Sequence, residues 1–114
     1  MNKTNLVRSV AAGKMTVAIY DSRLSMGNAA AIDAAIKIRE MLKEKDEVNI
    51  LFACAVSQTE FFAALFAQPD IEWRRINGFV MDEYMGLDKS NPGLLANFAN
   101  ANIFSKKTFS TASC

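Results

Sequence analysis

Short apolar runs alternate along the chain with longer segments in which apolar residues recur at helical spacing. The runs are MTVAIYD, VNILFAC and INGFVM, at residues 15–21, 48–54 and 76–81. Each has the β-branched and apolar residues typical of strands, and each precedes a segment with a helical pattern. A strand–helix order repeated three times predicts a parallel α/β sheet with right-handed connections. We therefore expect a three-layer, Rossmann-like sheet flanked by helices.

The segment SMGNAAAIDAAIKIREMLKEKDE, residues 25–47, carries the clearest helical pattern. Strong helix formers dominate it, and its apolar and charged residues separate onto opposite faces of a helix. The apolar face holds Ala31, Ala34, Ala35, Ile38, Met41 and Leu42, and the charged face holds Asp33, Lys37, Glu40 and Glu44. We expect an amphipathic helix here.

The next two units are predicted from shorter signals. The nearly continuous apolar run at 48–54 favours a parallel strand covered on both faces. Residues 57–67 predict a helix that begins with a hydrogen bond from the Glu60 N–H to the Ser57 side chain and ends before Pro69. A last helix is expected to begin near Pro92, because proline suits the first turn.

Two further segments are interpreted from composition alone. The tail KKTFSTASC is polar and lacks periodicity, so we do not expect it to form the next strand. Trp73, with Arg74 and Arg75 beside it, is interpreted as a surface aromatic next to solvated cations.

Composition indicates a single globular domain and excludes several function classes. The chain has 114 residues, of which 51% are hydrophobic, and 13 Lys and Arg against 12 Asp and Glu. This near-balance gives no electrostatic reason to expect nucleic acid or an anionic membrane as a partner. No apolar run is long enough to span a bilayer. The chain has no histidine, so neither histidine catalysis nor a histidine metal site is expected.

The cysteines favour a cytoplasmic protein. Cys54 lies inside an apolar run and Cys114 is the last residue, which makes them a poor disulfide pair. No signal-peptide segment is recognised at the start of the sequence. We expect a reduced protein in the cytoplasm.

Candidate chemistry lies in the two loops that follow the second and third predicted strands. Ligands of parallel α/β sheets bind at the carboxyl ends of the strands. In CAVSQT, the Ser57 hydroxyl and the helix N-terminus suit a phosphate, but Ser57 also fits a simple helix cap. In MDEYMGL, Asp82 and Glu83 are adjacent, so one is expected to reach the cleft while the other caps or pairs nearby. A solvated turn is the alternative for these two acids.

The segment DIEWRRINGFVMDEYMGL strongly resembles the glucosamine-6-phosphate deaminase/isomerase family, whose motif Met-Asp-Glu-Tyr is followed by Gly-Leu. GNAAAIDAAIKIREML, ILFACAVSQTEFFAAL and NFANANIF resemble other segments of that family in the same order. The resemblance implies an enzyme that converts glucosamine 6-phosphate to fructose 6-phosphate and ammonia without a metal or other cofactor. It implies that Asp82 transfers the proton and that Glu83 supports it. Ala55, Val56, Ser57 and Gln58 would then form the substrate-binding phosphate loop.

Members of this family are longer, and their second half supplies an Asp-x-His segment and a further glutamate that assist ring opening. We therefore expect residues 1–114 to form a single, incomplete domain, the N-terminal part of the family fold, with impaired activity. Family members often form oligomers, so a homo-oligomer is a further expectation. Two alternatives stay open, namely a non-catalytic module that binds a sugar phosphate and a relative of the 6-phosphogluconolactonases.

Overall fold

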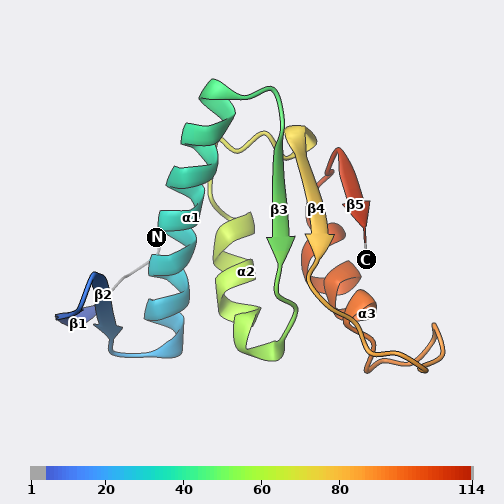
Figure 1. The fold of residues 1–114 in the computed structure, drawn as a ribbon, viewed down its shortest axis with the longest axis horizontal. Coiled ribbons are helices and arrows are strands. Elements are labelled where there is room, and N and C mark those ends of the chain that lie inside the picture. The colour runs from blue at the N-terminus through green and yellow to red at the C-terminus, as the bar shows by residue number, and fades with distance from the viewer. Residues whose placement is uncertain (1–4, 114) are drawn as a thin grey trace.

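The computed structural model describes residues 5–113, which form a small parallel sheet, a separate hairpin and three helices (Figure 1). The strands are β1 (Leu6–Ala12), β2 (Met15–Tyr20), β3 (Val48–Phe52), β4 (Ile76–Val80) and β5 (Thr111–Ser113). The helices are α1 (Arg23–Glu44), α2 (Thr59–Phe66) and α3 (Leu95–Ala99), and a π-helical turn, Asn100–Phe104, continues α3. Two 3₁₀ turns, Val56–Gln58 and Trp73–Arg75, precede α2 and β4.

The main sheet has the order β3-β4-β5, and all three strands are parallel. Val48 pairs with Ile76 and Phe52 with Val80, so β3 and β4 run in register over their full length. The helix α2 connects β3 to β4, and α3 connects β4 to β5. The predicted parallel α/β sheet flanked by helices is therefore confirmed.

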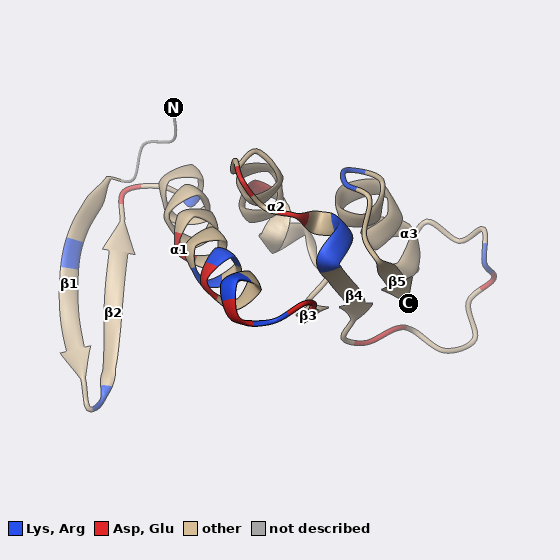
Figure 2. Cartoon of the chain, turned by 90° about the horizontal axis from the view of Figure 1, so that it is seen from above, with Lys and Arg blue, Asp and Glu red and all other residues tan. Residues whose placement is uncertain are grey.

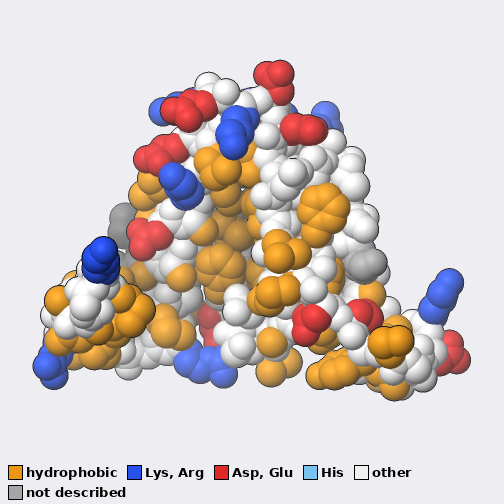
Figure 3. Space-filling view, viewed as in Figure 1, with side chains coloured by type: hydrophobic (Ala, Val, Ile, Leu, Met, Phe, Trp, Pro, Cys, Tyr) orange, Lys and Arg blue, Asp and Glu red, His pale blue; other side chains and the backbone are white. Residues whose placement is uncertain are grey.

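The three helices lie on one side of this sheet (Figure 2). Alternate strand residues such as Phe52 and Ile76 face the helices and are buried. The residues between them face the opposite side of the sheet, which no helix covers. On that side Leu51 is 63% exposed and Phe79 is 36% exposed. Hydrophobic side chains gather on this uncovered face (Figure 3). The prediction that the run 48–54 is covered on both faces is wrong within residues 5–113.

Aromatic rings fill the space between the sheet and α2 and α3. Phe109 packs edge-on against Phe104, with ring centroids 5.4 Å apart. Gly78 of β4 lies directly beneath these rings, and a Cβ atom there would stand 2.7 Å from Cε1 of Phe104. A side chain at this position would therefore push the rings off the strand. Trp73 joins the same cluster, 4.9 Å from Phe66, so its interpretation as a surface aromatic is wrong.

Helix α1 agrees with its predicted pattern. Ala31, Ala35, Ile38 and Leu42 are buried, and the predicted charged face is exposed. The end of α1 is held by Arg75, whose guanidinium donates to the carbonyls of Leu42, Lys45 and Asp46 at 2.6–2.8 Å. Arg75 is therefore a cap for orphan helix carbonyls and not the solvated cation expected from the sequence.

The strand predicted at 15–21 forms, but not in the parallel sheet. It is β2, which pairs antiparallel with β1 around a tight turn at Gly13, where φ is +64°. Glycine tolerates this left-handed backbone without strain. The hairpin projects from the start of α1, away from β3 (Figure 2). The apolar pattern of 15–21 specified a strand, but its partner, residues 6–12, was not recognised.

The C-terminal segment differs from its prediction in two places. Residues 111–113 form β5, which pairs with β4 from Asn77 to Phe79, so the interpretation of the tail as a segment without a strand is wrong. Pro92 lies in the loop before α3 and not in its first turn. Cys54 is buried as expected, and Cys114 lies outside the described residues. None of the helices within 5–113 combines the length and hydrophobicity needed to cross a bilayer.

Candidate functional site

A cavity of about 570 Å³ lies at the carboxyl ends of β3 and β4. The loop after β3 and the loop after β4 form its walls, and the start of α3 completes it. It is lined by residues 53–56, by Met81, Asp82 and Tyr84, and by residues 92–95 with Phe98. The two loops singled out in the sequence therefore meet in one cavity, as the topology of a parallel sheet requires.

Asp82 supplies the only carboxylate among the residues that line this cavity. It follows β4 by two residues and is exposed. Its side chain has no hydrogen bond or ion pair with any other residue in the described part of the chain. Mostly apolar groups surround it, including the side chains of Met81 and Leu94. The Asp82 carboxylate is thus available to contact a ligand in the cavity.

Glu83 turns away from the cavity and binds the start of α3. Its carboxylate accepts hydrogen bonds from the backbone N–H groups of Leu95 and Ala96, both at 2.7 Å, and of Tyr84 at 2.9 Å. Leu94, the residue at the N-cap position, has no side-chain cap of its own. Glu83 therefore caps α3 from twelve residues away and ties the acidic loop to that helix.

These hydrogen bonds also set the ionisation of Glu83. Partial loss of hydration raises the pKa of Glu83, but the three N–H groups favour the ionised form more strongly and lower the pKa overall. The adjacent acids therefore differ as expected, because Asp82 lines the cavity and Glu83 caps a helix. Whether Glu83 has a catalytic role stays a prediction.

The predicted substrate loop 55–58 is divided between two cavities. Ala55 and Val56 line the cavity that contains Asp82. Ser57 and Gln58 line a neighbouring cavity of about 280 Å³, which lies between α1 and the start of α2. Ser57 and Asp82 therefore line different cavities, which lie on opposite sides of the turn 55–58.

The predicted capping box does not form. Neither the 3₁₀ turn nor α2 has a cap hydrogen bond from a side chain at its N-cap position. The Thr59 hydroxyl instead donates to the Val56 carbonyl at 2.8 Å. Ser57 sits one residue before the N-cap, Gln58, because the intervening 3₁₀ turn delays the start of α2 to Thr59. The Ser57 hydroxyl thus has no part in starting the helix.

Arg23 is a residue of this region that sequence reasoning missed. It is the first residue of α1, and its guanidinium reaches the turn, donating to the Val56 carbonyl at 3.3 Å and to the Glu60 carboxylate at 2.8 Å. No local pattern marks Arg23, since its partners lie more than 30 residues away. The helices approach closely beside it, where a Cβ at Gly27 would lie 3.0 Å from the backbone N of Phe61.

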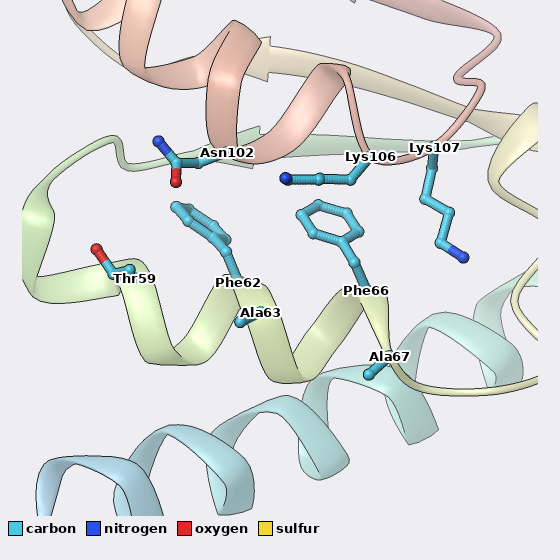
Figure 4. Close-up of a pocket in the computed structure, with 8 residues that line it drawn as sticks. All are labelled: Thr59, Phe62, Ala63, Phe66, Ala67, Asn102, Lys106 and Lys107. Atoms are coloured by element: carbon cyan, nitrogen blue, oxygen red, sulfur yellow. The ribbon is translucent and has the colours of Figure 1, made fainter.

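A third cavity, of about 430 Å³, lies between α2 and the segment that follows α3 (Figure 4). The rings of Phe62 and Phe66 form its floor, and Lys106 extends across them (Figure 4). No carboxylate lines this cavity, and its charged residues are Lys106 and Lys107. No cluster of metal-binding side chains occurs within residues 5–113. The cavity that contains Asp82 is the candidate site, because the loops after β3 and β4 meet there.

Comparisons with known proteins give likeness in structure alone. No family model matches the sequence, and no curated protein matches it. A monomeric glucosamine-6-phosphate deaminase, described as a missing link of the NagB superfamily, matches with a TM-score of 0.67 and 20% identity. The match covers 80% of this chain and 38% of the deaminase. A putative 6-phosphogluconolactonase from Neisseria gonorrhoeae matches with a TM-score of 0.69 and 18% identity, covering 82% of this chain and 40% of the lactonase.

Two consequences follow from these matches. The chain spans less than half the length of either solved protein, so their activities belong to larger molecules than residues 1–114. The expected fold is nevertheless confirmed over four-fifths of the chain. This chain therefore has the α/β fold of part of a NagB-superfamily deaminase, a fold that it shares with a 6-phosphogluconolactonase.

Proposed function

We propose that this chain binds glucosamine 6-phosphate and, like a glucosamine-6-phosphate deaminase/isomerase, transfers a proton with Asp82. The observation that carries the proposal is the position of Asp82, without a protein partner, in the cavity that Ala55 and Val56 also line. A volume of about 570 Å³ is within the usual range for small-molecule sites. The likeness in fold to a deaminase, together with the Met-Asp-Glu-Tyr motif, supports the choice of substrate.

The proposed step begins from the open-chain aldose. The Asp82 carboxylate takes the proton from C2, and the C–H electrons form a C1–C2 double bond while O1 gains a proton from water. Asp82 then returns its proton to C1, which becomes an alcohol carbon while O1 keeps its proton. The electrons of the C1–C2 double bond form the new C1–H bond, and the nitrogen lone pair forms a C2=N bond. The nitrogen at C2 becomes an imine, and water hydrolyses it to fructose 6-phosphate and ammonia. The proposal assigns ring opening to no residue of this chain, so slow turnover is expected.

The phosphate of the substrate is proposed to lie on the turn 55–58. The backbone there leads into the N-terminus of α2, where helix N–H groups and the helix dipole favour an anion. Ala55 and Val56 lie in the same cavity as Asp82, and residues at the start of α3 make its opposite wall apolar. The sugar would then extend from the turn toward the acid.

The test measures exchange at C2 as well as ammonia release. We expect the 114-residue chain, incubated with glucosamine 6-phosphate in D₂O, to replace the C2 proton by deuterium, as followed by proton NMR. Asp82→Asn should slow this exchange by at least about 100-fold, the usual contribution of a positioned general base. Asp88→Asn removes an exposed acid from the same loop outside the cavity, and it should leave exchange unchanged.

Substrate binding without exchange in the unaltered chain would indicate instead a non-catalytic sugar-phosphate module. The second structural neighbour also supports an alternative reaction, hydrolysis of 6-phosphogluconolactone, with water as the nucleophile and Asp82 as the base. Lactone hydrolysis that depends on Asp82, with no exchange at C2 of glucosamine 6-phosphate, would favour that alternative. Absence of binding to either sugar phosphate would overturn the proposed function.

A further inference from the structure

We infer that Arg23 is a positioning residue for the turn 55–58, and this inference rests on the proposed function. Arg23 holds the Val56 carbonyl in the orientation that presents the Ser57 N–H to the substrate phosphate. The residue belongs to α1 and lies outside the cavity that contains Asp82. It therefore acts on the ligand through the backbone of the turn.

The hydrogen bonds at Val56 carry the inference. The Val56 carbonyl accepts from the backbone N–H of Thr59, from the Thr59 hydroxyl at 2.8 Å and from Nη2 of Arg23 at 3.3 Å. The peptide between Val56 and Ser57 is trans, so its C=O and N–H point in opposite directions. With the carbonyl held toward Arg23, the Ser57 N–H is directed away from α1.

Glu60 fixes the guanidinium that makes this contact. Its carboxylate accepts from the same Nη2 atom at 2.8 Å, and it lies in the first turn of α2. The pairing also neutralises an acid close to the proposed phosphate position, where an uncompensated negative charge would oppose binding. Arg23 thus orients the peptide and masks the one acidic side chain in the first turn of α2.

Close packing of the helices keeps Arg23 in place. Gly27 is one helical turn after Arg23, on the same face of α1. A Cβ at Gly27 would lie 3.0 Å from both Cβ of Glu60 and N of Phe61, so the two helices already touch there. The backbone of Arg23 therefore lies close to the start of α2, while its side chain is 63% exposed. An exposed ion pair of this kind adds little to stability, so its removal should not unfold the chain.

Arg39 provides a matched control on the same helix. Its guanidinium also clamps a backbone carbonyl beyond α2, donating to Pro69 from Nε at 3.1 Å and from Nη2 at 2.8 Å. Arg39→Ala removes the same charge and a comparable contact at the opposite end of α2. It leaves the turn 55–58 and both cavities beside that turn unaltered.

The experiment titrates the folded 114-residue chain with inorganic phosphate and follows the Ser57 amide resonance by NMR. Arg23→Ala should weaken phosphate binding by about threefold to tenfold and shift the Ser57 resonance even without phosphate. Arg23→Lys should recover only part of the affinity, since a single ammonium does not reproduce the guanidinium contacts. Arg39→Ala should change neither quantity, and thermal unfolding of each variant confirms that the fold is retained.

The double variant Arg23→Ala, Glu60→Ala separates positioning from simple charge masking. Because the Val56 carbonyl still lacks its contact with Arg23, affinity should remain low. Full recovery in the double variant, or equal affinities of the Arg23→Ala variant and the unaltered chain, would overturn the inference while leaving the proposed function intact. A chain that binds no phosphate at this turn would overturn both.

Discussion

The carboxylate of Glu83 and the backbone N–H of Leu95 meet at 2.7 Å and close the loop that joins β4 to α3. Asp82, the preceding residue, thereby has its backbone anchored on one side by β4 and on the other by α3. The apolar wall of the candidate site comes from the same helix. One hydrogen-bonded acid therefore positions both the proposed base and part of the wall of the candidate cavity.

Glu83→Ala should loosen this loop and lower the thermal unfolding midpoint by several degrees. Three backbone N–H groups lose their shared acceptor, and α3 loses the side chain that caps its N-terminus. The midpoint is measured by circular dichroism, and amide hydrogen exchange at Leu95 and Ala96 reports the local effect. Glu40→Ala on the exposed face of α1 is the control. Unchanged protection of these two amides would contradict the role of Glu83 as a cap.

The lowered pKa of Glu83 predicts a stability change confined to acid pH. Its ordinary value is 4.5, and the folded chain holds it below that value. A lowered folded pKa favours the ionised, folded form, so this contribution is fully present above about pH 4.5 and is lost as pH falls through the folded pKa. Urea unfolding of the unaltered chain and of Glu83→Gln, compared from about pH 2.5 to 7, checks it. The two curves should converge at low pH, and a constant gap would contradict the prediction.

The sequence was enough to predict the parallel sheet and to predict that the loops after β3 and β4 meet. Periodicity alone predicted α1, because a long helix repeats its burial pattern many times. The rule that ligands bind at the carboxyl ends of parallel strands predicted that the loops after β3 and β4 meet, and Ala55 and Val56 do line one cavity with Asp82. The opposite directions expected for Asp82 and Glu83 also followed from the alternation of an extended backbone.

The remaining features depend on partners that no local pattern encodes. Residues 15–20 have the composition of a strand, but only tertiary contacts decide whether such a strand joins a sheet or a hairpin. Arg75 and Arg23 bind backbone carbonyls, which every residue possesses and which therefore leave no signature in the sequence. Ser57 fitted a cap motif, but an intervening 3₁₀ turn moved the helix start by two residues.

Arg75→Ala should destabilise the fold by about 2 kcal/mol, since the carbonyls at the end of α1 would lose a charged donor. The neighbouring Arg74→Ala removes the same charge from an exposed side chain and should change stability by less than about 0.5 kcal/mol. Urea unfolding of both variants measures the difference. Equal effects would show that Arg75 is a solvated cation, as its sequence context alone suggests.

Adjacent residues of β3 distinguish the covered face of the sheet from the uncovered one. Phe52 is 4% exposed and packs edge-on against Phe62, with ring centroids 6.0 Å apart, whereas Leu51 points to the side without helices. Phe52→Ala leaves a cavity in the aromatic cluster and should cost about 3–5 kcal/mol. Leu51→Ala removes a side chain that is already largely hydrated, so its cost should stay below about 1 kcal/mol. Equilibrium unfolding at low protein concentration measures both. A comparable loss for Leu51→Ala would mean that its face is covered in solution, and dependence of that loss on protein concentration would identify a second copy of the chain as the cover.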